Sequence, residues 1–134
     1  MRKKQTITVL AFFIALFFIQ CGSGDKALNK KLTQMAAEIN TSAPRMLDQH
    51  TRFDKAEVTK ENVFQYYYSI VDVDNPDELV ENSLQSLKEI MSETFATNPD
   101  LKIFKENDVI VQYIYNDVNN RNIQTITITP NDYK

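Results

Sequence analysis

Glycine is confined to one short stretch of this chain, and its absence elsewhere restricts the turns that the fold can use. The sequence has two glycines, Gly22 and Gly24, and none after them. Turns that need a positive φ angle must therefore use Asn or Asp, which tolerate the left-handed region better than other side chains. The segment 116–121, NDVNNR, is rich in both residues and predicts a tight turn. The same absence excludes the usual glycine-rich loops that hold phosphate groups.

The first twenty residues have the composition of an export signal. Three bases, Arg2, Lys3 and Lys4, precede a run over 7–19 that is apolar except for one threonine. As a helix this run would be about 20 Å long, whereas the hydrocarbon core of a bilayer is about 30 Å thick. The length therefore predicts the apolar region of a cleaved signal peptide over residues 1–20. An uncleaved signal anchor is the alternative that stays open.

The one cysteine of the chain, Cys21, directly follows the apolar run and is followed by a small residue. This arrangement resembles the signal of bacterial lipoproteins, in which a cysteine at this place is lipidated and becomes the mature N-terminus. Gln20 departs from the Gly or Ala that is usual before that cysteine. The resemblance covers residues 1–25. It implies a lipidated Cys21, a short spacer over residues 21–25 and one folded domain over residues 26–134.

Cleavage would also change the balance of charge. Removing the first twenty residues takes away three bases and no acid, so the formal net charge falls from −3 to −6. An acidic chain is poorly suited to nucleic acids, because binding to them depends on basic contacts to phosphate. The same argument applies to anionic lipid surfaces, so attachment to a membrane must come from acyl chains. Two or more chains give stable binding. We expect a cell-envelope protein, at the outer membrane in preference to the inner, without a nucleic-acid partner.

Apolar periodicity predicts two helices in the rest of the chain. The first, over 26–39, places five apolar residues on one stripe: Leu28, Leu32, Met35, Ala36 and Ile39. The second should begin at Asp74 or Asn75, which can cap it, with Pro76 in its first turn. Its expected buried stripe is Val80, Leu84, Leu87, Met91 and Phe95. The segment 98–100, Asn-Pro-Asp, should end this helix.

Four segments rich in aromatic and β-branched residues predict strands. They are 53–58, 63–71, 108–115 and 122–129. The order α-β-β-α-β-β favours the α+β class, with an antiparallel four-stranded sheet and two helices on one face. Successive side chains of a strand point to opposite faces, so Tyr67 should lie on the open face of the sheet.

The composition excludes several kinds of catalytic site. One histidine, His50, and one cysteine cannot make a Cys/His zinc site or a Cys–His nucleophile pair. No serine lies in a nucleophile-elbow motif that could use His50. Acids are plentiful, yet no pair of carboxylates stands out from an ordinary acidic surface. We expect no cofactor, no metal and no enzymatic activity.

The densest polar segment, 40–54, resembles a pattern in small exported bacterial proteins that have no assigned activity. The matching residues are Asn40, Pro44, Asp48, Thr51, Arg52 and Asp54, followed by the pairs Tyr66/Tyr68 and Tyr113/Tyr115. The resemblance covers most of the mature chain and implies a shared fold.

Two roles stay open for this segment. In the structural one, Asp48 caps a turn and Arg52 ties the exit of the first helix to the edge of the sheet. In the functional one, a small site for an anion or a peptide is formed by Asp48, His50, Arg52, Asp54 and Tyr67.

Together these features favour a lipid-anchored envelope protein whose domain binds a protein partner without catalysis. An inhibitor or immunity-type protein is the first alternative, and it would insert a loop such as 72–77 or 116–121 into the cleft of an envelope enzyme. A small hydrolase that uses Asp48, Arg52 and Asp54 is the third possibility.

Overall fold

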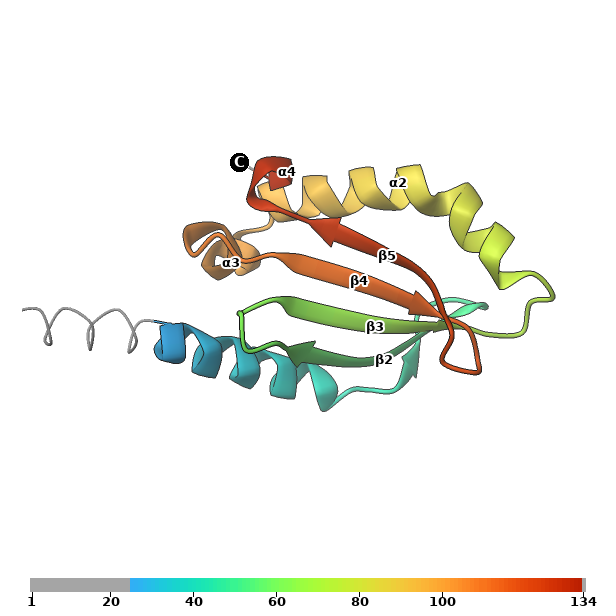
Figure 1. Ribbon diagram of the computed structural model, residues 1–134, viewed down its shortest axis with the longest axis horizontal. Helices are drawn as coiled ribbons and strands as arrows, with labels where there is room; N and C mark the ends of the chain where they lie inside the picture. The colour runs from blue at the N-terminus through green and yellow to red at the C-terminus, as the bar shows by residue number, and fades with distance from the viewer. Residues whose placement is uncertain (1–24, 134) are drawn as a thin grey trace, which may run out of the picture.

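The computed structural model describes residues 25–133. The expected signal peptide over 1–20, Cys21 and most of the spacer lie outside these residues. The described chain forms one sheet with the N-terminal helix along one side and helix α2 (Pro76–Thr97) along the other (Figure 1). The N-terminal helix is described over residues 25–40, which confirms the helix predicted there.

The sheet has five strands and is mixed. In chain order they are β1 (Arg45–Met46), β2 (Thr51–Val58), β3 (Phe64–Ile70), β4 (Val111–Asn116) and β5 (Asn122–Ile128). They lie side by side in the same order. The neighbours β1/β2, β2/β3 and β4/β5 are antiparallel, whereas β3 and β4 are parallel.

The purely antiparallel, four-stranded sheet expected from the sequence is therefore wrong. The β3–β4 connection contains α2, and this helix returns the chain to the end of the sheet at which β3 began. Val111, the first residue of β4, consequently lies opposite Phe64, the first residue of β3. Parallel neighbours need a crossover of this kind. The fifth strand, β1, was not predicted because two residues are too few to show alternation.

Helix α2 begins where the local signals predicted. The side chain of Asn75 caps it by accepting a hydrogen bond from the backbone N–H of Glu78 at 3.3 Å, and Pro76 occupies the first turn. Asn98 ends the helix as expected. Three short helices after it were not predicted: η1 (Pro99–Leu101), α3 (Lys102–Glu106) and α4 (Pro130–Tyr133).

One hydrophobic core lies between the sheet and the helices. Leu32 of the N-terminal helix and Phe95 of α2 are buried in the same cluster as Phe64 and Val111 of the central strands. Phe104 of α3 packs edge-on against Phe64, with 5.1 Å between ring centroids. Both long helices therefore pack on one face of the sheet, as predicted.

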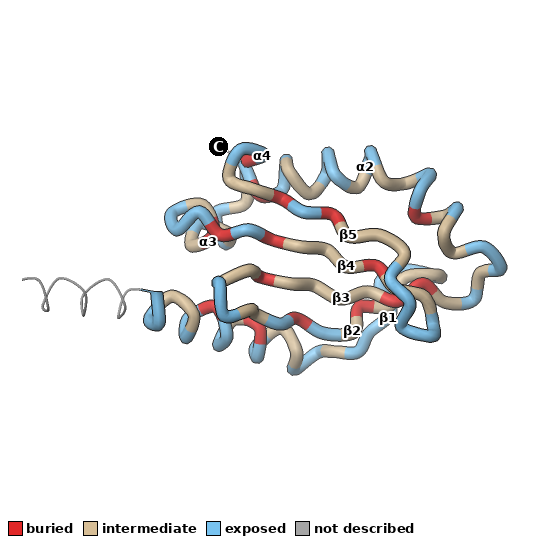
Figure 2. Tube along the Cα trace, in the orientation of Figure 1, coloured by how far each residue is buried: buried red, intermediate tan, exposed pale blue. Residues whose placement is uncertain are grey.

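The middle of α2 is less buried than its apolar stripe suggested. Val80 and Phe95, near the two ends, are buried, whereas the three apolar residues between them are only half-buried: Leu84, Leu87 and Met91. Figure 2 shows this contrast along α2, with buried residues only near its ends. The stripe of α2 therefore leaves apolar side chains partly open to solvent.

The turns confirm what the lack of glycine predicted. Among the described residues, the backbone positions with positive φ are Asn62, Asp72, Asp108 and Asn120, at 53–63°. All four are Asn or Asp, the side chains that best tolerate this region. Asn120 lies in the predicted turn between β4 and β5.

Asn40 fixes the end of the N-terminal helix to the edge of the sheet. Its side-chain Nδ2 donates to the carbonyl of Ala56 at 2.9 Å, and its Oδ1 accepts from the N–H of Ala56 at 2.7 Å. The amide thus pairs with the backbone of β2 as a neighbouring strand would. This contact gives the first residue of the 40–54 pattern a structural role.

Candidate binding site

Four tyrosines from the two central strands form a continuous aromatic row on the face that carries the helices. The parallel register sets Tyr66 opposite Tyr113 and Tyr68 opposite Tyr115. The rings of these two pairs are stacked at 5.1 Å and 5.0 Å between centroids, with interplanar angles of 8° and 18°. The rings of Tyr68 and Tyr113, with 6.2 Å between their centroids, link the two pairs. We call these four residues the tyrosine ladder.

The surroundings of the ladder keep its phenols neutral. Burial, which disfavours a charged phenolate, raises the pKa of Tyr66 and of Tyr115 to about 12. The carboxylate of Asp48 acts in the same direction on the pKa of Tyr115. Burial also raises the pKa values of Tyr68 and Tyr113 well above their usual range. All four hydroxyls therefore keep their protons near neutral pH and can donate hydrogen bonds.

None of these hydroxyls is used by the described part of the fold. Within residues 25–133, no hydrogen bond joins the four ladder hydroxyls to another residue, and no buried side-chain oxygen lacks a partner, so the hydroxyls reach solvent. Tyr133 behaves differently, since its hydroxyl donates to the carbonyl of Val109 at 2.9 Å. The ladder thus has polar groups that are available to a ligand.

Two hollows that share Leu47 lie beside the ladder on the same face. The larger, about 500 Å³, lies between the β1–β2 turn and the first half of α2. The smaller, about 80 Å³, lies beside the end of the N-terminal helix. We call the two hollows together the tyrosine groove, and their main apolar and aromatic lining residues are Ile39, Leu47, Phe53, Tyr66, Tyr68, Ile70, Leu79, Leu87 and Tyr115.

The rim of the tyrosine groove is also apolar. Met46 and Leu47, in β1 and directly after it, are each 50% exposed. Across the larger hollow, Leu87 of α2 is only half-buried. Exposed apolar side chains grouped around a hollow are typical of interaction sites on proteins.

Asp48 and His50, two of the predicted site residues, line the larger hollow. Asp48 Oδ1 accepts hydrogen bonds from the N–H groups of His50 and Thr51, each at 2.8 Å. These bonds stabilise the carboxylate and lower the pKa of Asp48. His50 Nδ1 lies 3.1 Å from the carbonyl oxygen of Val71. Asp48 therefore caps the β1–β2 turn, as the structural interpretation expected.

The other three predicted residues lie on the opposite face of the sheet. Arg52 Nε donates to Asp54 Oδ1 at 2.6 Å, and the hydroxyl of Ser69 donates to Asp54 Oδ2 at 2.5 Å. Asp54 follows Arg52 by two residues and therefore shares its face. The break in register between Phe53 and Lys55 brings Lys55 to this face as well. Tyr67 lies on the same face, where the ammonium of Lys55 is 4.9 Å from its ring centroid.

The structure thus divides the predicted site instead of assembling it. Asp48 and His50 belong to the tyrosine groove, whereas Arg52, Asp54 and Tyr67 belong to the outer face. Arg52 pairs with Asp54 and not with the exit of the first helix. The missed element is the tyrosine ladder. Its signal in the sequence is the repeated Tyr-x-Tyr, but only a parallel pairing of the two strands brings the repeats together.

Residues 25–133 contain no group of three or more His, Cys, Asp or Glu side chains placed to hold a metal ion. Over the same residues, every helix is too short or too polar to span a bilayer.

Solved structures with the same fold come from three bacteria. A protein of Pseudomonas aeruginosa described as secreted matches with a TM-score of 0.72 and 16% identity, over 82% of this chain and 96% of that one. EpsS, a pilotin of the Vibrio vulnificus type 2 secretion system, matches with a TM-score of 0.64 and 8% identity, over 84% and 97%. AspS, a type II secretion system pilotin of Vibrio cholerae, matches with a TM-score of 0.60 and 12% identity, over 84% and 97%.

The sequence itself matches one family model. No curated protein matches the chain. The model of a domain of unknown function, DUF8479, matches residues 27–125, which include α2, the whole tyrosine ladder and all but the first two residues of the N-terminal helix. The chain therefore belongs to the DUF8479 family.

Proposed function

We propose that this chain is a lipid-anchored protein of the cell envelope whose domain binds a protein partner without catalysis. The anchor is the lipidated Cys21, exposed when the signal peptide over 1–20 is removed. The binding surface is the tyrosine groove, and its occupant is an apolar segment of the partner. The outer membrane is the expected location in preference to the inner.

One observation carries the binding part of the proposal: the ladder combines three half-buried aromatic rings and the buried ring of Tyr115 with hydroxyls that the described fold does not use. Aromatic residues that offer both apolar area and a hydrogen-bonding group are enriched in protein interfaces. The half-buried Leu87 and the exposed Leu47 supply the apolar walls. A polypeptide segment can bury these side chains and accept hydrogen bonds from the phenols at the same time.

The comparisons support the envelope setting through the fold. Two of the similar structures are pilotins of type II secretion systems, and a third is described as secreted. Identities of 8–16% make this a likeness of fold. It agrees with the export signal and lipidation site that the sequence of residues 1–25 predicts.

The inhibitor alternative is less well supported. Its two candidate loops, 72–77 and 116–121, contain no aromatic residue. They are also held together, because Arg121 Nη2 lies 2.6 Å from Asp77 Oδ2 and Arg121 Nε lies 3.1 Å from Asp117 Oδ2. A pair of loops tied to one another is a poor candidate for a projection that enters an enzyme cleft.

The hydrolase alternative needs Asp48, Arg52 and Asp54 in one site. Asp48 lines the tyrosine groove, whereas the side chains of Arg52 and Asp54 pair on the other face of the sheet. The structure therefore does not favour this alternative.

The anchor is tested by replacing its thiol. We expect Cys21→Ser to leave a precursor that keeps its signal peptide and takes up no labelled palmitate in growing cells. If the unchanged protein takes up no acyl label either, the lipid anchor is wrong and the uncleaved signal anchor becomes the better explanation.

The groove is tested by photo-crosslinking in the cells that make the protein. A photoreactive residue at Leu87, in the groove, should give one adduct of defined mass, whereas the same residue at Thr127, which is exposed on the outer face, should give none. Leu47→Asp should reduce the Leu87 adduct, because it puts a charge on the groove wall.

The matched control is Val118→Asp. Val118 is 63% exposed in the β4–β5 turn, so this change also adds one acid at an exposed apolar position. It should leave the adduct unchanged. Equal adducts from positions 87 and 127, or an adduct that Leu47→Asp does not reduce, would assign the partner to another surface.

A further inference from the structure

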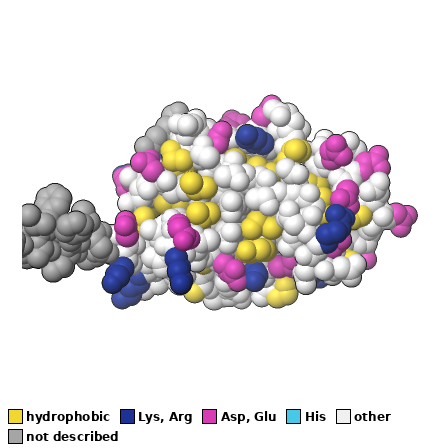
Figure 3. All heavy atoms as spheres, viewed as in Figure 1, with side chains coloured by type: hydrophobic (Ala, Val, Ile, Leu, Met, Phe, Trp, Pro, Cys, Tyr) yellow, Lys and Arg dark blue, Asp and Glu magenta, His cyan; other side chains and the backbone are white. Residues whose placement is uncertain are grey.

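Lysines gather at the end of the molecule from which the chain continues toward Cys21. Lys26, Lys30 and Lys31 lie in the first two turns of the described N-terminal helix, and all three are exposed. Figure 3 shows dark-blue side chains at this end, beside the grey atoms of the residues that are not described. In a chain with a net charge of −3, this is a local reversal of sign.

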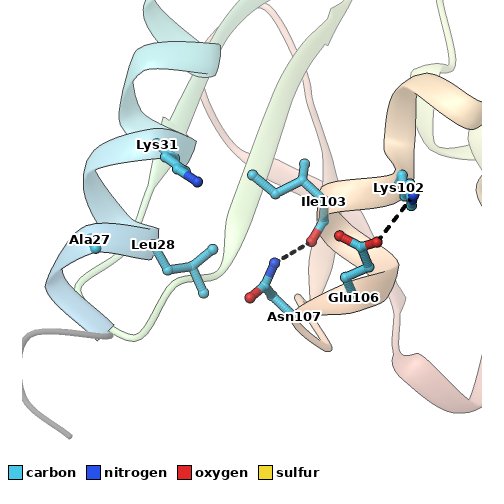
Figure 4. A pocket seen from close by; sticks show the side chains of 7 residues that line it. All are labelled: Ala27, Leu28, Lys31, Lys102, Ile103, Glu106 and Asn107. Atoms are coloured by element: carbon cyan, nitrogen blue, oxygen red, sulfur yellow. Dashed lines mark hydrogen bonds and ion pairs between the residues drawn. The ribbon is translucent and has the colours of Figure 1, made fainter. Parts of the chain in front are cut away.

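A second element, far away in the sequence, brings another lysine to the same place. A hollow of about 460 Å³ separates the N-terminal helix from α3, and Lys31 and Lys102 line it from opposite sides (Figure 4). Lys102 is held only by an exposed ion pair with Glu106 at 3.4 Å. No ion pair within residues 25–133 involves Lys31.

Two apolar side chains also line this hollow. Leu28 from the N-terminal helix and Ile103 from α3 point toward one another across it (Figure 4). Asn107 lies at its border and donates to the carbonyl of Ile103 at 2.9 Å. The hollow therefore combines two apolar side chains with two ammonium groups and the carboxylate of Glu106. We call it the lysine hollow.

We propose that the lysine hollow is a binding site for an anionic phospholipid of the membrane that carries the protein. The two ammonium groups would hold the phosphate of the headgroup, and Leu28 and Ile103 would contact the first carbons of the acyl chains. Lysines near a membrane surface attract anionic lipids over distances of about the Debye length. Glu106 would exchange its contact with Lys102 for solvent when the phosphate binds.

The position of the hollow supports this occupant. Ala27 lines it, and residues 22–26, which separate Cys21 from Ala27, span at most about 18 Å when fully extended. A lipidated Cys21 would therefore keep the lysine hollow near the headgroups at all times. The inference rests on the lipid anchor of the proposed function, and the experiment below separates the two.

The test uses the mature full-length protein, purified from membranes and reconstituted into vesicles of phosphatidylcholine with or without phosphatidylglycerol. An Ala27→Cys variant carries a maleimide fluorophore in the hollow, and an Asn119→Cys variant carries it in the distant β4–β5 turn. The readout is quenching of the fluorophore by spin-labelled lipid. We expect stronger quenching at position 27 with phosphatidylglycerol than without it, and none at position 119.

Charge-neutralising variants give the decisive comparison. Lys31→Gln with Lys102→Gln should abolish the part of the quenching that depends on phosphatidylglycerol. Lys55→Gln with Lys88→Gln removes the same charge from exposed positions on β2 and α2, and it should leave that part intact. The proposal is overturned if quenching at position 27 is equal in the two kinds of vesicle, or if both double variants lose it equally.

Failure of the anchor has its own signature. A lipidated thiol does not react with maleimide, so the protein without an added cysteine should stay unlabelled. If Cys21 does take up the fluorophore, the anchor is wrong. The proposed lipid site is then tested by co-flotation of the protein with phosphatidylglycerol vesicles. Binding that the Lys31/Lys102 variant loses still supports the site, and absence of binding overturns it.

Discussion

The two faces of the sheet are built from alternate residues of the same strands, yet they treat their polar groups in opposite ways. On the outer face, side chains satisfy one another: Gln65 donates to Gln112 at 2.9 Å, and the hydroxyl of Tyr67 donates to Gln65 at 3.2 Å. On the helix-bearing face, the phenols of the tyrosine ladder make no hydrogen bond with the described residues. A face whose polar groups are already paired has few groups that can bond to a partner. The ladder hydroxyls, in contrast, can still do so.

This difference changes how the tyrosines are interpreted. Tyr67 seemed the natural binding residue while it was expected on an open face, but there it is held by Gln65 and Lys55. Tyr66 and Tyr113, on the helix-bearing face, lie half-buried in the ladder, and their hydroxyls have no partner among the described residues. For a binding role, a free polar group in a half-buried position matters more than exposure alone.

The largest loss of stability should come from ionising the tyrosine ladder. Burial raises the pKa values of all four tyrosines, and those of Tyr66 and Tyr115 reach about 12, so the unfolded chain loses these protons first as the pH rises. The stability that neutral phenols give is complete below about pH 10 and is lost as the pH rises through the folded values. Denaturant unfolding between about pH 9 and pH 12 should show a steep loss. A Tyr66→Phe/Tyr115→Phe variant should lose less stability over this range. An equal loss in that variant would mean that the ladder does not cause the alkaline destabilisation.

The next largest loss of stability should come from the core on the helix-bearing face. Phe64 is fully buried, and its ring centroid lies 5.1 Å from that of Phe104. Phe64→Ala should therefore lower the free energy of unfolding by about 3–5 kcal/mol. Leu84→Ala should cost less than this, because Leu84 is only half-buried. Chemical denaturation of the two variants measures the difference. If the two costs were the same, Leu84 would be packed far more tightly than the structure shows.

Breaking the polar network of the outer face should have an intermediate effect. Asp54→Ala removes the acceptor of the buried Ser69 hydroxyl, and we expect a loss of about 1–3 kcal/mol. Glu57→Ala on the same face breaks only an exposed pair with Lys55 and should cost less than about 1 kcal/mol. Thermal or denaturant unfolding measures both. A cost for Asp54→Ala as small as that for Glu57→Ala would mean that solvent replaces the lost acceptor.

Removing a single hydroxyl should change the stability least. It tests most directly whether the ladder hydroxyls serve binding or the fold. Tyr113→Phe deletes a hydroxyl that has no partner among the described residues, so stability should change by less than about 0.5 kcal/mol. Tyr133→Phe deletes one that donates to Val109, and it should cost about 0.5–1.5 kcal/mol. Tyr113 stacks on Tyr66 and Tyr68, which line the smaller hollow, so only Tyr113→Phe should weaken the adduct formed in the groove. A larger stability loss for Tyr113→Phe than for Tyr133→Phe would show that the ladder hydroxyl has a role in the fold itself.

The parts of the fold that the sequence predicted correctly depend on neighbouring residues. The Asn75 cap with Pro76 in the first turn, and the Asn and Asp residues at positive φ, act within a few positions of the chain. Such interactions can be recognised without knowing what lies across the molecule.

The parts that were missed depend on contacts between distant segments. Whether β3 and β4 are parallel is decided by where α2 and α3 return the chain, and no residue of either strand encodes that path. The tyrosine ladder exists only because Tyr66 and Tyr113, 47 positions apart, become neighbours in this arrangement. The division of the 40–54 segment likewise depends on a distant element, because Asp48 and His50 line a hollow whose other wall is α2, whereas Arg52 and Asp54 pair on the opposite face.

The contact between Asn40 and Ala56 has a consequence beyond the helix end that it holds. A strand at the border of a sheet offers its free N–H and C=O groups to any other extended chain, and such pairing starts aggregation. Because the amide of Asn40 already engages both backbone groups of Ala56, and β1 covers β2 at Arg52 and Phe53, a second molecule meets an edge that is already occupied. On this edge of the sheet, one side chain thus opposes pairing with a second molecule, and we expect its loss to make the oligomeric state of the protein depend on concentration.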